Sequence, residues 1–156
     1  MATLTASVAL DVRAQVVNCR ALPDPGHYPY YGPAPQYSIA RRAYSPTNPP
    51  TLELRIAISP KAFAGGSMVR LGCKLAADFS REKNIHALIF DNVDAARNLS
   101  LGDANQPPHR KYLWHLKARY ALNRDRKNHF IEVVLPQVKD GLLTLERIKY
   151  WLSSGE

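Results

Sequence analysis

Three side chains of this sequence have types suited to acid–base chemistry: Asp91, His115 and Lys117. Asp91 directly follows an apolar segment, residues 85–90, that is predicted to be a strand. Ligands of parallel sheets gather beyond the carboxyl ends of the strands, so a carboxylate there could act as a base or hold a metal. We favour the simpler expectation that Asp91 or Asn92 caps a short helix over residues 93–98.

His115 and Lys117 have the His-x-Lys spacing of phosphodiester-cleaving enzymes, in which an imidazole attacks phosphorus and an ammonium holds an oxygen. That pattern also needs an aspartate five residues after the lysine, and Leu122 stands there. We therefore expect a polar, basic strand face at this point. The alternative, a hydrolytic or phosphodiester-acting enzyme, requires Asp91 to meet His115 and Lys117 in one cleft.

No other motif predicts a reaction, a metal or a cofactor. Gly65 and Gly66 precede a predicted helix, but neither a P-loop nor a dinucleotide fingerprint follows, and Ser67 is expected to be the N-cap. The remaining histidines fall in separate segments without metal-ligand spacing. His86, within the apolar segment, is expected to be a core residue whose polar atoms have partners.

The segment 109–128 is strongly basic, with seven Lys and Arg against one Asp, in a chain of net charge +8. It predicts a hairpin with strands over 111–123 and 128–135, in which Asn123 pairs with Asn128 and Arg119 faces Glu132. The aromatic side chains of the first strand share its apolar face, and the cations share the other face and the tip. The expected contacts for an acidic partner or polyanion are His115, Lys117, Arg124, Arg126 and Lys127.

The elements that position these residues predict an α+β fold. Leu52–Ile58 alternates as a strand, residues 67–80 have the period of an amphipathic helix, and a second strand at 85–90 should pair in parallel with the first. For residues 140–152 we favour a helix, although strand alternation fits as well. The expected sheet is mixed, with about four or five strands including the C-terminal hairpin, and the helices pack on it.

The N-terminal third differs from the rest in composition. Nine of the twelve prolines lie between residues 23 and 60, together with several tyrosines. This composition predicts an extended arm over residues 1–50, with a short edge strand near its start, packed against a single α+β domain over residues 51–156. A purely structural alternative is that the arm itself binds a partner protein.

Two cysteines, Cys19 and Cys73, are too few for a disulfide scaffold. They could form one bridge from the arm to the first helix, which would indicate an oxidising compartment, although we slightly favour free thiols. No apolar run has the length of a membrane span. The default location is cytoplasmic; export stays open if the N-terminus is the remnant of a leader peptide.

These observations predict a small binding or interaction module, not an enzyme, whose basic hairpin contacts an acidic protein or another polyanion. The hydrolytic alternative rests on Asp91 with residues of the hairpin. The oligomeric state does not follow from the sequence.

Overall fold

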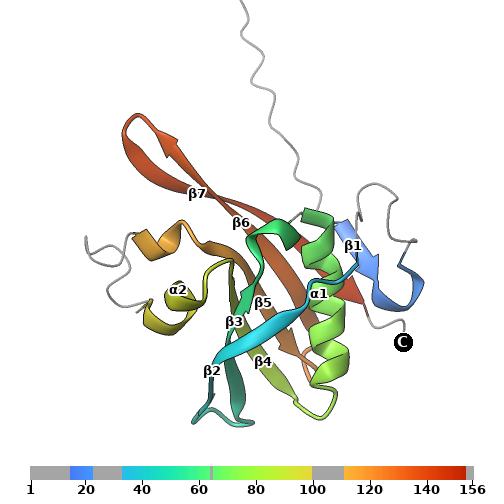
Figure 1. Ribbon diagram of the computed structural model, residues 1–156. Helices are drawn as coiled ribbons and strands as arrows, with labels where there is room; N and C mark the ends of the chain where they lie inside the picture. Colours follow the sequence, from blue (N-terminus) through green and yellow to red (C-terminus); the bar gives the residue numbers. More distant parts are fainter. Residues whose placement is uncertain (1–14, 23–32, 64, 100–110, 154–156) are drawn as a thin grey trace, which may run out of the picture.

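A seven-stranded mixed sheet dominates the structure, a computed structural model that describes residues 15–22, 33–63, 65–99 and 111–153. The strands lie in the order β1-β7-β6-β5-β4-β3-β2 (Figure 1). Their bounds are Gln15–Asn18 (β1), Tyr37–Ser45 (β2), Thr51–Ile58 (β3), Asn84–Phe90 (β4), Leu116–Asn123 (β5), Asn128–Lys139 (β6) and Leu142–Ser153 (β7). The helices are α1 (Gly65–Asp78) and α2 (Val93–Asn98), with short 3-10 turns at Cys19–Ala21 and Pro60–Ala62.

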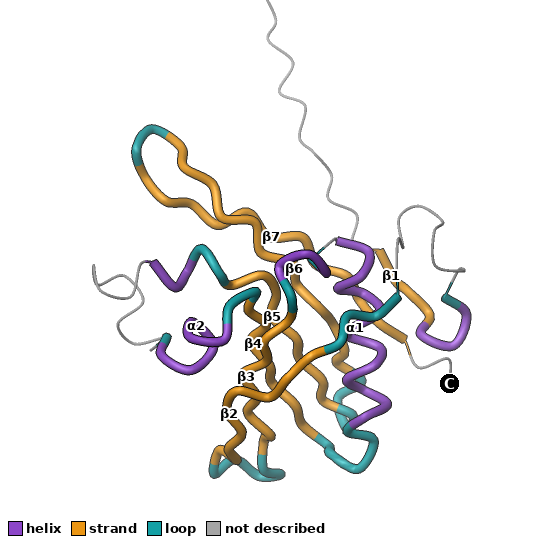
Figure 2. Tube along the Cα trace, in the orientation of Figure 1, coloured by secondary structure: helices purple, strands orange, loops and turns teal. Residues whose placement is uncertain are grey.

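The expected α+β sheet of four or five strands is therefore wrong, and the fold is more sheet-dominated (Figure 2). The predicted C-terminal helix is a strand, β7, which pairs with β6 over the whole range from Phe130↔Trp151 to Lys139↔Leu142. Asp140 and Gly141 turn between them with φ of 52° and 75°, as a two-residue primed hairpin turn requires. The second element that the sequence did not predict is the strand β2, which lies within the proline-rich region and pairs antiparallel with β3.

The strand–helix–strand unit is confirmed. The strands β3 and β4 pair in parallel, and α1 connects them. Met68, Leu71 and Leu75 of α1 are fully buried, because they face one side of the sheet at helical spacing. The helix begins at Gly65, so Ser67 is not its N-cap; the Ser67 hydroxyl donates to the carbonyl of Ala62 at 2.8 Å.

The two faces of the sheet have different cores. The face under α1 holds the larger core, which includes Leu54, Ile56, Ile89 and Ile131. The opposite face has a smaller core where α2 packs, around Phe90. Beyond this smaller core, the second face carries polar and charged side chains.

The β5–β6 hairpin has the predicted register, with Asn123↔Asn128 and Arg119↔Glu132. Its first strand is shorter than predicted, because β5 starts at Leu116 and residues 111–113 form a helical turn. The pairing of β5 with β4 is interrupted by a β-bulge. Its register shifts between Ile89↔Ala118 and Phe90↔Leu116, so Lys117 has no partner position on β4. Trp114 consequently lies off the strand, and 43% of it is exposed.

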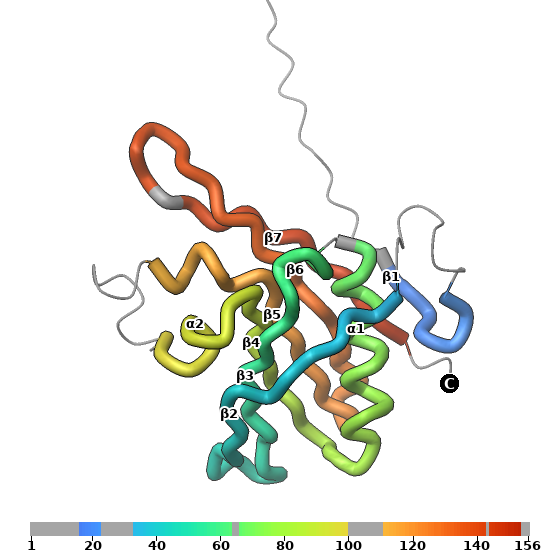
Figure 3. The backbone as a smooth tube through the Cα atoms, viewed as in Figure 1, coloured from blue at the N-terminus to red at the C-terminus, as the bar shows by residue number. Residues whose placement is uncertain are grey.

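The β6–β7 hairpin extends past the other strands as a two-stranded projection (Figure 3). Val138 and Leu142 near its tip are 62% and 67% exposed.

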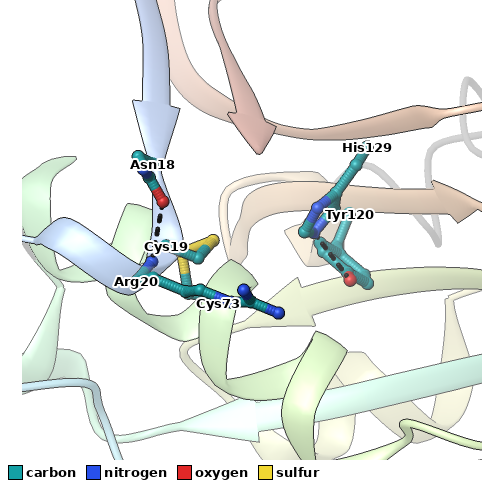
Figure 4. The surroundings of a disulfide bond; sticks show 6 residues. All are labelled: Asn18, Cys19, Arg20, Cys73, Tyr120 and His129. Atoms are coloured by element: carbon teal, nitrogen blue, oxygen red, sulfur yellow. Dashed lines mark hydrogen bonds between the residues drawn. A yellow bond between two sulfur atoms is a disulfide. The ribbon is translucent and has the colours of Figure 1, made fainter. Parts of the chain in front are cut away.

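A disulfide joins Cys19 to Cys73, with 5.4 Å between the Cα atoms (Figure 4). It links the turn after β1 to α1, where the sequence had favoured free thiols. β1 is a short edge strand that pairs in parallel with β7. None of the helices in the described ranges is long and apolar enough to cross a membrane.

Candidate functional site

Asp91, His115 and Lys117 lie together at the carboxyl end of β4. The Nδ1 atom of His115 is 2.7 Å from Asp91 Oδ1, and Lys117 Nζ is 3.4 Å from Asp91 Oδ2. The backbone amide of Asp91 also donates to the carbonyl of His115 at 3.0 Å. The Asp91 side chain is only 15% exposed, whereas the His115 side chain is 41% exposed. The three side chains that the hydrolytic alternative names are therefore in contact with one another.

Of the two residues expected to cap the helix 93–98, the structure uses Asn92 and not Asp91. Asn92 is the N-cap of α2, and its Oδ1 accepts from the amide of Ala95 at 2.9 Å. Asp91 is thus not needed to start that helix. Its carboxylate is instead hydrogen-bonded to His115, just before β5, and forms an ion pair with Lys117 in β5.

The three cations of the basic hairpin tip differ in their surroundings. Arg124 binds the end of α1: its guanidinium donates to the carbonyls of Glu82, Ala76 and Phe79 at 2.8, 3.0 and 3.5 Å. Arg126 and Lys127 are exposed. Two hollows flank the tip, one lined in part by Arg124 and Lys127 and the other by Arg126.

A row of charged residues crosses the second face of the sheet. Neighbouring strands place five charged residues and one leucine side by side, one from each of β2 to β7: Arg41, Arg55, Leu88, Arg119, Glu132 and Lys149. We call this set the cationic row. With about 4.8 Å between strands, it spans about 24 Å. It carries four cationic side chains and one carboxylate.

The carboxylate of the row is already paired. Glu132 is 7% exposed, and its Oε1 lies 3.6 Å from both Arg119 Nε and Arg147 Nη1. Lys149 is its cross-strand neighbour. One buried negative charge is thus surrounded by three cations, which leaves this half of the row positive.

The other half of the row places two like charges directly opposite each other. Arg41 and Arg55 are cross-strand partners, an arrangement that usually destabilises a sheet. Burial first, and then the charge of Arg41, lowers the pKa of Arg55, while Glu53 acts in the opposite direction. Arg55 also donates to the carbonyl of Leu99. A hollow of about 280 Å³ lies here, lined in part by both arginines.

Beside the cationic row runs a second row that ends in apolar residues. Phe130, Trp151 and Val16 follow one another across β6, β7 and β1. Val16 is 73% exposed, whereas Phe130 is 6% exposed. Lys149 Nζ lies 4.5 Å from the ring centre of Phe130, and the Arg119 guanidinium lies 5.4 Å from it. The cations of the row therefore cover the aromatic ring.

Two other histidines occupy contrasting places. His86 is not a core residue: its Nδ1 is 3.0 Å from Glu53 Oε2, and its side chain is 31% exposed. His129 is buried, with Nε2 3.0 Å from the Tyr120 hydroxyl (Figure 4). Burial, followed by the nearby charge of Arg124, lowers the pKa of His129 to about 4. Within the described ranges, no three His, Cys, Asp or Glu side chains are grouped to hold a metal ion.

No protein-family model, curated protein or solved structure matches this chain.

Sequence reasoning named Asp91, His115 and Lys117 but missed Arg41, Arg55, Arg147 and Lys149. The signal for the last two was the strand alternation of residues 143–151, which was set aside for a helix. The block 41–83 had a visible excess of basic residues. Nothing in the sequence indicated which of them would share a sheet face with the hairpin.

Proposed function

We propose that this protein is a binding module that receives an acidic segment of a partner protein on the cationic row. The observation that carries this proposal is the row itself, with four cations and one paired carboxylate on adjacent strands. Arg55 is held by the carbonyl of Leu99, but the like charge of Arg41 directly opposite it does not help the sheet to form. An anionic ligand would relieve that repulsion.

The length of the row sets the size of the segment. About 24 Å corresponds to about seven residues of extended chain at about 3.3 Å per residue. Three of the four cations are arginines, whose planar guanidinium groups bind carboxylates through paired hydrogen bonds. The partner segment is therefore an extended run rich in Asp and Glu.

The neighbouring residues favour a protein over a single-stranded nucleic acid. Base stacking needs an open aromatic face, and the ring of Phe130 is covered by Arg119 and Lys149. Trp151 and the exposed Val16 extend the charged area with apolar surface. Arginine and tryptophan beside apolar area are typical of the energetic centres of protein interfaces.

The disulfide supports a location outside the reducing cytoplasm. A Cys19–Cys73 bridge persists in an oxidising compartment, and we extend the proposal to an exported protein.

The test is fluorescence anisotropy with a fluorescein-labelled octa-glutamate peptide at low ionic strength. The variant R41Q/R119Q/K149Q removes three charges from the row. With about 0.5 kcal/mol for each exposed pair, we expect binding about tenfold weaker. Added salt should weaken wild-type binding more steeply than binding by the variant.

The matched control is R81Q/R126Q/K127Q, which removes three exposed charges, one in the loop after α1 and two at the hairpin tip. It should bind within about twofold of wild type, because screening limits the effect of distant charges. Equal losses in both variants would show a diffuse charge effect. Tighter binding of an oligothymidine or of dextran sulfate than of the peptide would contradict the acidic-protein partner.

A further inference from the structure

The Asp91–His115 pair has a geometry that the binding role does not use. Two contacts fix the imidazole: the Nδ1 hydrogen bond to the Asp91 carboxylate and the bond from the Asp91 amide to the His115 carbonyl. In the tautomer that donates from Nδ1 to the carboxylate, Nε2 carries a lone pair. Within the part of the chain that the structure describes, Nε2 has no hydrogen-bond partner, and the side chain is 41% exposed.

We propose that His115 is the general base of a hydrolytic site for carboxylic esters, with Asp91 as its positioning residue. A carboxylate on Nδ1 orients a histidine and stabilises the imidazolium that forms during proton transfer. The site lies at the carboxyl end of β4, where that strand pairs in parallel with β3. Ligands of such sheets bind in this position.

Lys117 decides between ester and phosphodiester chemistry. Its ammonium contacts Asp91 Oδ2 at 3.4 Å and donates to the Trp114 carbonyl at 3.1 Å, and its side chain is 17% exposed. It therefore balances the charge of Asp91 and does not reach out to hold a phosphate. A phosphodiester is already anionic and needs cationic groups at its oxygens, whereas a carboxylic ester is neutral and can be attacked by water under general-base catalysis without such a cation.

The attacking group is water: both described cysteines are joined in the disulfide, and no serine or threonine hydroxyl in the described ranges is hydrogen-bonded to His115 Nε2. His115 Nε2 takes a proton from water as the water oxygen bonds to the ester carbonyl carbon. The carbon–oxygen bond to the alcohol then breaks, and the leaving oxygen takes that proton from the imidazolium. The products are a carboxylic acid and an alcohol, and nothing is oxidised or reduced.

His86 provides an internal control. It also holds a carboxylate on Nδ1, from Glu53 at 3.0 Å, and its side chain is 31% exposed. It lies within β4, away from the carboxyl end of that strand, and is not part of the proposed site. Any exposed imidazole hydrolyses activated esters slowly, so comparing the two histidines separates a built site from that background.

The experiment measures hydrolysis of p-nitrophenyl acetate and p-nitrophenyl butyrate by wild type and by the variants H115N and H86N. Asparagine keeps a donor where Nδ1 was and removes Nε2. A general base contributes about 10² to 10⁴-fold, so we expect H115N to lose at least about a hundredfold in kcat/KM. H86N should keep the wild-type rate. Unfolding curves of all three proteins show whether the fold is intact.

The positioning role of Asp91 is tested with a separate variant, D91N. D91N keeps an oxygen that can accept from Nδ1 but removes the charge that stabilises the imidazolium. We expect kcat to fall about tenfold or more while KM changes less than about twofold. Wild-type hydrolysis no faster than that of H115N would overturn the proposal, as would equal losses in H115N and H86N. An intact kcat in D91N would overturn the positioning role.

Discussion

Protonation of the buried His129 should lower the free energy of unfolding of this protein at acid pH. The residue is 7% exposed and lies beneath α1, with its ring bonded to the Tyr120 hydroxyl at 3.0 Å. Burial is the main cause that lowers its pKa from 6.5 to about 4, and the charge of Arg124 adds to it. A hydrogen bond to the backbone of Gly72 opposes the shift in pKa. The folded protein therefore keeps this imidazole neutral where the unfolded chain would protonate it.

The sign and size of the effect follow from that difference in pKa. Because the folded pKa is depressed, the unfolded state binds more protons between pH 6.5 and 4, and the free energy of unfolding falls as pH falls. One pKa unit corresponds to about 1.4 kcal/mol, so the full effect is about 3 kcal/mol. The contribution is complete above about pH 6.5 and is lost by about pH 4.

The assay is urea unfolding at pH 7, 6, 5 and 4, followed by tryptophan fluorescence, for wild type and for H129Q. Glutamine offers the Tyr120 hydroxyl a hydrogen-bond partner but does not titrate. Carboxylates titrate in both proteins, so the wild-type minus H129Q difference isolates the imidazole. That difference should fall by about 3 kcal/mol between pH 7 and pH 4. A difference that stays constant with pH would refute the reasoning.

Three further perturbations test the packing. The double variant C19S/C73S should lower the free energy of unfolding by about 4 kcal/mol, as chain entropy predicts for a 54-residue separation, and dithiothreitol should affect wild type alone. R124A should lower it by about 2 kcal/mol because three carbonyl bonds at the end of α1 are lost, while R126A should change it by less than about 0.5 kcal/mol; equal effects would contradict the capping role. G72A should cost about 1 to 3 kcal/mol in urea unfolding, since its Cβ would lie 2.7 Å from Leu152 Cδ1; unchanged stability would mean that Leu152 moves freely.

Local patterns predicted the centre of the fold well. The alternation of Leu52–Ile58, the helical period after Ser67 and the apolar segment 85–90 each correspond to an element, because each has a single periodicity. The register of the β5–β6 hairpin followed from its four-residue loop. The same reasoning brought Asp91 to the end of a strand.

The sequence predictions were wrong where one segment fits both a helix and a strand and only its pairing with another strand decides between them. Leu142, Leu145, Ile148 and Leu152 fit a helix, but pairing with β6 holds them in a strand. Prolines suggested extended, polyproline-like backbone between residues 23 and 50, yet none lies within Tyr37–Ser45, the edge strand β2. The cationic row combines six strands, so it became visible only with the sheet order. The disulfide likewise depends on β1 meeting α1.

The most direct test of the proposed binding role is a ¹H–¹⁵N correlation spectrum of the labelled protein during titration with octa-glutamate. The account predicts that the largest shifts fall at Arg41, Arg55, Arg119 and Lys149, across four different strands, and that they shrink together as salt is added. Shifts concentrated at Arg126 and Lys127, or shifts absent from the cationic row at saturating peptide, would contradict it.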